Sequence, residues 1–122
     1  MKFYKLNSDK QESINLSDYK MDWNRKISAP QKAVSDFLRR FWEFDTVLLE
    51  FRIPGSLLRI DILNVSKKIA VEVSPDSVHK NFNPFLHKNR SEFLKKLKAD
   101  IAKIAWCEKS GLTFVELNDS DI

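Results

Sequence analysis

The spacing of apolar side chains changes along the chain, and each change predicts a new structural element. Ser28 and Gln31 have the spacing of a helix capping box, and Val34 and Leu38 follow at helical spacing. We therefore expect a first helix over roughly residues 28–44.

Three extended runs follow this helix. Residues 46–53, 57–64 and 68–74 are rich in β-branched and other apolar side chains, and Pro54-Gly55 between the first two is a strong turn signal. Because the links between the runs are short, we expect an antiparallel meander of three strands.

Residues 75–88 have an irregular pattern and predict a loop. A long helix is expected from about Asn89 and should end near Gly111, because glycine commonly follows a helix C-terminus. Its apolar stripe is formed by Phe93, Leu94, Leu97, Ile101 and Ile104. Residues 112–117 predict a final strand.

The expected order is helix, three strands, helix, strand. The second helix would act as a crossover and return the last strand parallel to a neighbour. This order predicts an α/β fold with a mixed sheet and helices packed on it, over residues 28–122.

Residues 1–27 are polar, carry isolated aromatic side chains and predict an arm with little regular structure. Arg25 and Lys26 follow Trp23, so the arm could contact DNA. It could equally be a terminal extension that covers the core.

Composition narrows the function only modestly. The chain has 122 residues, 43% of them hydrophobic, and a net charge of +4 with a pI of about 9.2. A mildly basic domain can bind a polyanion, although many small proteins are as basic. Cys107 is the single cysteine, so no internal disulfide can form, which fits a cytoplasmic protein. No segment is long and apolar enough to predict a membrane span.

Two acidic residues interrupt the apolar strands. If Ser66-Lys67 is a two-residue turn, Asp61 lies directly opposite Glu72 on the same face of the sheet. Two like charges this close repel each other, and a bridging Mg²⁺ ion, which prefers oxygen ligands, would remove the conflict. Alternatively, the two acids lie on an exposed face and are neutralised by Arg59 and Lys68.

Glu50 is a third acidic candidate. If Pro54-Gly55 closes the first hairpin, Glu50 pairs near Arg59, on the same face as Asp61. It would then form a cross-strand ion pair with Arg59, contribute to the acidic site, or do both.

The loop after Glu72 carries candidate bases and cations. His79 follows closely enough to fold over Glu72, where it could act as a general base or hold a phosphate. Lys80, Lys88 and Arg90 are placed to meet a DNA backbone. Solvated side chains are the simpler interpretation for each of them.

The long helix carries Lys96, Asp100 and Lys103 at positions that border its apolar stripe. Such residues are either ordinary helix ion pairs or a polar edge that faces the active end of the sheet.

These residues together resemble the PD-(D/E)XK nuclease superfamily, and more closely its branch of very-short-patch mismatch endonucleases and phage-type homing endonucleases. The resemblance covers roughly residues 28–117. It rests on the segments Leu58–Ile62 and Ile69–Val73, then on His79, Asp100 and Lys103. The expected element order is also the core of that superfamily, which has the restriction-endonuclease-like fold.

The resemblance implies roles for individual residues. Asp61 and Glu72 would be the metal ligands, and the carbonyl of Val73 would complete the site. His79 matches a histidine after the third strand, and Asp100 with Lys103 matches a polar pair on the second helix.

Two positions depart from the family pattern. The lysine expected two residues after the second acid is Ser74, so another cation or His79 must take its part, with Lys80, Lys88 and Lys103 as candidates. The counterpart of a glutamate on the first helix of many relatives is Gln31.

The resemblance implies an endonuclease that cleaves double-stranded DNA with Mg²⁺, for which Mn²⁺ may substitute, in a bacterial or phage-infected cell. A small domain grips little DNA alone, which favours a homodimer or higher homo-oligomer. The alternatives are a DNA-binding module that has lost catalysis and a nuclease specific for junctions or RNA.

Overall fold

The computed structural model describes residues 1–25, 29–74, 90–118 and 121. Its elements are β1 (Lys2–Tyr4), β2 (Gln11–Ser13), η1 (Leu16–Asp18), α1 (Ala29–Trp42), β3 (Val47–Arg52), β4 (Arg59–Asn64), β5 (Ile69–Ser74), α3 (Arg90–Lys109) and β6 (Thr113–Asn118). None of the helices in these residues is long and apolar enough to cross a membrane.

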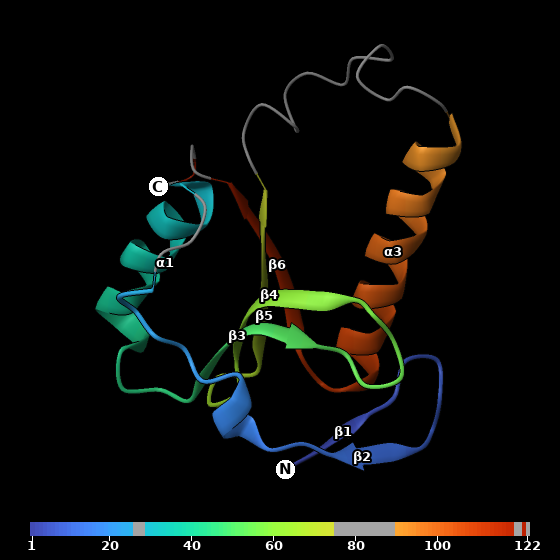
Figure 1. The fold of residues 1–122 in the computed structure, drawn as a ribbon, viewed down its shortest axis with the longest axis horizontal. Helices are drawn as coiled ribbons and strands as arrows, with labels where there is room; N and C mark the ends of the chain where they lie inside the picture. The colour runs from blue at the N-terminus through green and yellow to red at the C-terminus, as the bar shows by residue number, and fades with distance from the viewer. Residues whose placement is uncertain (26–28, 75–89, 119–120, 122) are drawn as a thin grey trace.

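A four-stranded mixed sheet forms the centre of the molecule, in the order β3-β4-β5-β6 (Figure 1). The β3–β4 and β4–β5 pairs are antiparallel, and the β5–β6 pair is parallel. Both the predicted meander and the predicted parallel return of the last strand are therefore confirmed. The protein has a mixed α/β fold.

The two helices cover opposite faces of this sheet. On one face, Val34, Leu38 and Trp42 of α1 join a buried cluster with Ile62 and Val71. On the other face, the buried apolar residues come from the C-terminal end of α3, from β3, β4 and β5, and from β1. They are Phe3, Leu48, Phe51, Ile53, Ile60, Leu63, Ala70, Trp106 and Cys107.

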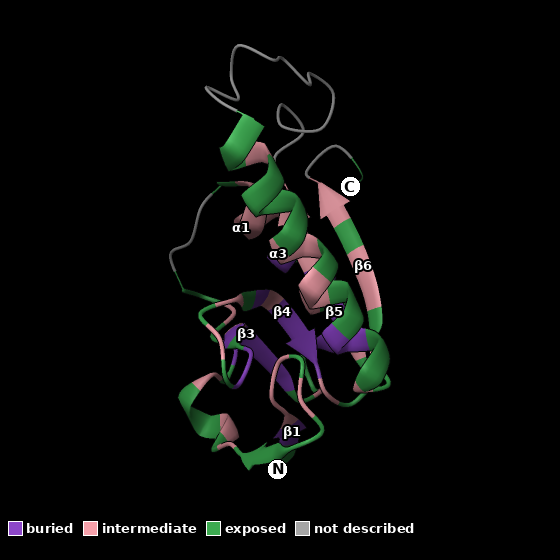
Figure 2. Cartoon of the chain, turned by 90° about the vertical axis from the view of Figure 1, so that its right-hand side faces the viewer, coloured by how far each residue is buried: buried purple, intermediate pink, exposed green. Residues whose placement is uncertain are grey.

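Only the C-terminal end of α3 is anchored in this way. Trp106 and Cys107 are its buried residues, and most of the preceding turns are exposed (Figure 2). The apolar stripe predicted for this helix does not cover the sheet: Leu97 and Ile101 remain 43% and 57% exposed. The residues of α3 that are buried on the sheet, Trp106 and Cys107, lie outside this stripe.

The N-terminal segment is more regular than its sequence predicts. β1 and β2 form an antiparallel hairpin, and Phe3 is buried with its ring centroid 4.8 Å from that of Phe51. The indole Nε1 of Trp106 donates to the carbonyl oxygen of Tyr4 at 2.8 Å. These strands are three residues long and cannot hold their shape alone, so docking on the core defines them.

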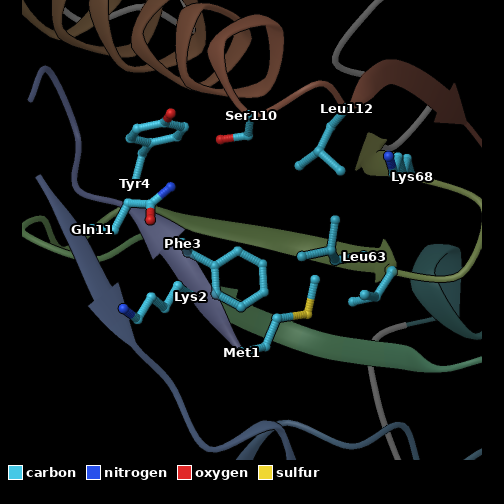
Figure 3. Close-up of a pocket in the computed structure, with 10 residues that line it drawn as sticks. Met1, Lys2, Phe3, Tyr4, Gln11, Leu63, Lys68, Ser110 and Leu112 are labelled. Atoms are coloured by element: carbon cyan, nitrogen blue, oxygen red, sulfur yellow. The ribbon is translucent and has the colours of Figure 1, made fainter. Parts of the chain in front are cut away.

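The hairpin covers the core rather than standing away from it. A small cavity of about 160 Å³ remains between the hairpin and the sheet, where Phe3, Leu63 and Leu112 line it (Figure 3). The N-terminal segment therefore contains a short hairpin that the sequence did not predict, and its aromatic side chains pack against the core.

The β3–β4 hairpin is twisted at one row of residues. Leu49 and Ile62 pack on the α1 face, yet Phe51 and Ile60, two residues further along each strand, pack on the α3 face. Alternate residues of a flat strand share one face, so the hairpin must twist between these rows. Glu50 lies at the twist with a φ of +50°, a left-handed conformation that is strained for a glutamate.

Candidate active site

The sheet brings Asp61 and Glu72 together as predicted. Ile62 pairs with Val71 and Leu63 with Ala70, so the next step of the register places Asp61 across from Glu72. The backbone N–H of Val73 donates to Oδ2 of Asp61 at 2.9 Å. The two carboxyl groups are close enough for the charge of Asp61 to raise the pKa of Glu72. The predicted register is therefore confirmed.

Glu72 lies in an environment that favours its protonated form. Its side chain is 16% exposed. Burial raises the pKa of the Glu72 carboxyl to about 7, and the negative charge of Asp61 contributes in the same direction. A proton held near neutral pH lets the two carboxyl groups lie side by side without full repulsion. A divalent cation could take the place of that proton.

Lys103 of α3 supplies a positive charge to the same group. Its Nζ lies 3.2 Å from Oε1 of Glu72, and its own side chain is 15% exposed. Its ammonium opposes the increase in the pKa of Glu72. Of the lysines considered as the cation of the site, Lys103 is thus the one that the structure places beside Glu72.

Ser74 has a different partner. Its hydroxyl donates to Oε1 of Glu116 at 3.0 Å, and Glu116 pairs directly with Glu72 in the parallel β5–β6 register. The sequence analysis missed Glu116, although Val115 and Leu117 flank it as Val71 and Val73 flank Glu72. That signal could have identified it, but only once the register of the crossover strand was known.

A cavity of about 390 Å³ opens beside these residues. It lies between α3 and the C-terminal halves of β5 and β6. Its lining residues are Glu72, Val73, Ser74, Lys96, Ala99, Asp100, Lys103, Ile104, Phe114 and Glu116. The predicted polar edge of the long helix, with Lys96, Asp100 and Lys103, therefore faces this cavity, and the C-terminal part of β5 forms its other wall.

Glu50 is not where the first hairpin was expected to put it. The N–H of Ile53 donates to the carbonyl of Leu58, so the loop spans residues 54–57 and Arg59 pairs with Arg52. The predicted Glu50–Arg59 pairing is wrong, because Pro54-Gly55 closes a longer loop than a two-residue turn.

Glu50 instead lies between the paired rows Leu49–Ile62 and Phe51–Ile60, as Asp61 does on β4. Its carboxylate forms an ion pair with Arg25 at 3.7 Å, and both side chains are partly exposed. Glu72 and Glu116 pair directly across β5 and β6, and Asp61 and Glu50 lie at the adjoining positions of β4 and β3.

The remaining predicted residues are dispersed. Gln31 lies in the first turn of α1, the helix on the other face of the sheet, and its Nε2 is buried without a hydrogen-bond partner among the described residues. Arg59 begins β4 and Arg90 begins α3, and both are exposed. Lys26, His79, Lys80 and Lys88 lie outside the described residues.

Asp61 and Glu72 are suitable ligands for a cation, but two side chains are too few to form a complete metal site. Asp61 and Glu72 offer the carboxylate oxygens that Mg²⁺ prefers as ligands. Within the described ranges, however, no three residues of the His, Cys, Asp and Glu types come close enough to form a complete site. Asp61 and Glu72 would thus hold a cation together with backbone oxygens, water or substrate, which is common for Mg²⁺.

Neither protein-family models, nor curated proteins, nor solved structures give a match to this chain.

Proposed function

We propose that this protein is a metal-dependent endonuclease that hydrolyses phosphodiester bonds of DNA on a restriction-endonuclease-like core. The observation that carries the proposal is the Asp61–Glu72 carboxyl pair with Lys103 on Glu72. A mixed sheet between two helices, in the order helix, three strands, helix, strand, supports it. The net charge of +4 is compatible with a polyanionic substrate.

Asp61 and Glu72 would hold Mg²⁺, or Mn²⁺ in its place, and the carbonyl of Val73 is the expected third ligand. When bound, the cation would supply an activated water and stabilise charge on the scissile phosphate. The N–H of Val73 fixes the orientation of the Asp61 carboxylate through Oδ2. Such fixed orientation keeps a ligand ready for the cation without reorganisation.

Lys103 provides the cationic side chain of the proposed site. In the absence of a metal, its ammonium neutralises part of the charge on Glu72. Once a metal neutralises the carboxylates, the same ammonium is free to stabilise a phosphate oxygen of the substrate. Lys96 lines the same cavity and adds positive charge where a DNA backbone would approach.

Nicking of supercoiled plasmid tests the proposal. We expect wild type to cleave plasmid or phage DNA with Mg²⁺ or Mn²⁺, and Asp61→Asn and Glu72→Gln to lose this activity while remaining folded. Lys95→Met, on an exposed part of α3, serves as the matched control and should retain cleavage. Wild-type cleavage rates in the Asp61→Asn protein would contradict the proposal.

A second candidate function is a DNA-binding module without catalysis. Ser74 favours it, because serine occupies the position of the motif lysine and its hydroxyl is engaged by Glu116. This alternative predicts metal-independent DNA binding that is retained in Asp61→Asn, with no cleavage by wild type on any DNA. Competition of plasmid by RNA or a four-way junction would reveal a different nucleic-acid substrate.

A further inference from the structure

The exposed face of α3 carries an apolar stripe that the fold leaves uncovered. Leu94, Leu97, Ile101 and Ile104 are 41%, 43%, 57% and 38% exposed. Soluble proteins tolerate single exposed apolar residues, but a continuous row of four along one helix typically marks an interaction surface.

Most of this stripe lies away from the candidate active site, and Ile104 is the one of its four residues that also lines the cavity. At 100° per residue, Lys103, Trp106 and Cys107 share the face that points to the sheet. Leu97 and Ile101 are on the opposite face, which Figure 2 shows as largely exposed. The polar side of α3 therefore serves the sheet and the cavity, whereas Leu94, Leu97 and Ile101 lie outside the cavity lining.

We propose that a second copy of this chain covers the stripe, with the two α3 helices packed antiparallel. The spacing of the four residues alternates between three and four, which is the pattern of a coiled-coil seam. With a two-fold axis near Ala99, Leu94 of one copy packs against Ile104 of the other. Leu97 then packs against Ile101 of the other copy, so the same surface matches itself.

The charges at the ends of the stripe select this orientation. Arg90 and Glu108 continue the spacing of the stripe at its two ends, and both are exposed. Within the described part of the chain, neither side chain forms an ion pair or hydrogen bond. The antiparallel arrangement brings Arg90 of one copy opposite Glu108 of the other, twice per dimer, whereas a parallel one would bring each residue against its own copy.

The helix dipoles favour the same orientation. Within a single α3, Arg90 lies at the positive N-terminal end and Glu108 near the negative C-terminal end, so each charge opposes the dipole. In the antiparallel pair, Glu108 lies near the N-terminus of the other helix and Arg90 near its C-terminus. Each charge therefore interacts unfavourably with the dipole of its own helix but favourably with the dipole of the partner helix.

Lys98 lies at the rim of the seam, close to the two-fold axis. The two Lys98 ammonium groups would repel each other, but this side chain is exposed and its ammonium can extend into solvent. Repulsion between the two Lys98 side chains therefore weakens the dimer slightly, and salt reduces this repulsion. Salt also weakens the attraction between Arg90 and Glu108, so the two effects of salt on dimer affinity oppose each other. A seam of two heptads is short, so we expect a dissociation constant of roughly 1–100 µM.

Sedimentation equilibrium of the full chain tests the dimer. Wild type should dimerise, and Leu97→Glu/Ile101→Glu should be monomeric, with circular dichroism and tryptophan fluorescence confirming that the fold is retained. Arg90→Glu and Glu108→Arg should each weaken the dimer roughly threefold to tenfold, and the double charge reversal should restore it. A wild type that stays monomeric at about 500 µM, well above that range, or a reversal that restores nothing, would overturn the proposal.

Cross-linking tests the orientation. Lys98→Cys should form a covalent dimer with a short bismaleimide, because residue 98 lies next to the axis. Ser91→Cys should not, because the two copies of residue 91 would be roughly 24 Å apart along the helices at 1.5 Å per residue. Equal cross-linking of both variants would indicate a parallel pair and contradict the model. These outcomes do not depend on nuclease activity, since the substituted residues Arg90, Ser91, Leu97, Lys98, Ile101 and Glu108 do not line the cavity.

Discussion

Lys103 on α3 and Glu72 on β5 form an ion pair across 31 residues of sequence, with Nζ 3.2 Å from Oε1. Both side chains are largely buried, and Asp61 is close enough to raise the pKa of Glu72. This pair joins the crossover helix to the acidic residues of the sheet. It places one cation where two carboxyl groups meet, which is the basis of the proposed function.

Replacing Lys103 should separate metal binding from catalysis. We expect Lys103→Met to lower kcat for plasmid cleavage about a hundredfold or more, since it removes a charge that stabilises the transition state. At a pH well above 7, where Glu72 is ionised in both proteins, Mn²⁺ should bind the variant at least as tightly, because a competing positive charge is gone. A variant that binds Mn²⁺ normally and also cleaves normally would remove Lys103 from the mechanism.

Two substitutions of Asp61 should differ in stability. Asp61→Asn removes the charge but keeps an oxygen that can accept from the N–H of Val73, whereas Asp61→Ala removes both. In the absence of metal, thermal unfolding should show Asp61→Asn at least as stable as wild type, because the repulsion with Glu72 is gone. Asp61→Ala should be about 1 kcal/mol less stable than Asp61→Asn. Equal stability of the two variants would show that the Val73 hydrogen bond contributes nothing.

The raised pKa of Glu72 predicts how stability depends on pH. In the folded protein this carboxyl keeps its proton up to about pH 7, whereas the unfolded chain releases it near 4.5. The folded state therefore binds more protons between these values, and the contribution of Glu72 to stability is full below pH 4.5 and lost as the pH rises to 7. Urea unfolding without metal, at pH 5 and pH 7.5, should show this loss in wild type and a smaller one in Glu72→Gln.

The left-handed backbone of Glu50 predicts that glycine stabilises the protein more than alanine at this position. At a φ of +50°, a side chain with a Cβ is strained and glycine is not. Glu50→Gly should therefore be about 1 kcal/mol more stable than Glu50→Ala in urea unfolding. If the Glu50→Ala protein were as stable as the Glu50→Gly protein, the twist of β3 would not depend on this conformation.

The sequence predicted the centre of the fold well, because its signals there are local. Apolar runs and short links defined the three-strand meander, and the short turn between Val65 and Lys68 set the register that aligns Asp61 with Glu72. Lys103 was a candidate because it borders the apolar stripe of the long helix. Its contact with Glu72 depends on how that helix lies on the sheet, which spacing alone does not determine.

The errors of the sequence analysis share a cause, which is packing between distant segments. The strand pairing of the N-terminal hairpin depends on Phe3 docking against Phe51 and Trp106, far away in sequence. The stripe of α3 has the pattern of a core face, and the sequence does not reveal whether the core belongs to one chain or two. The four-residue loop after Ile53 moved Glu50 away from Arg59.

Binding of Mn²⁺ tests the central claim most directly, because it needs no knowledge of a DNA recognition sequence. Titration calorimetry at pH 8, with electron paramagnetic resonance to count bound Mn²⁺, should show binding to wild type and a loss of at least tenfold in affinity in both Asp61→Asn and Glu72→Gln. Asp100→Asn, which lies in the same cavity but outside the proposed ligand set, should bind nearly as wild type. Equal binding by wild type and both carboxylate variants, or no binding by any of them, would contradict the assignment of Asp61 and Glu72 as metal ligands.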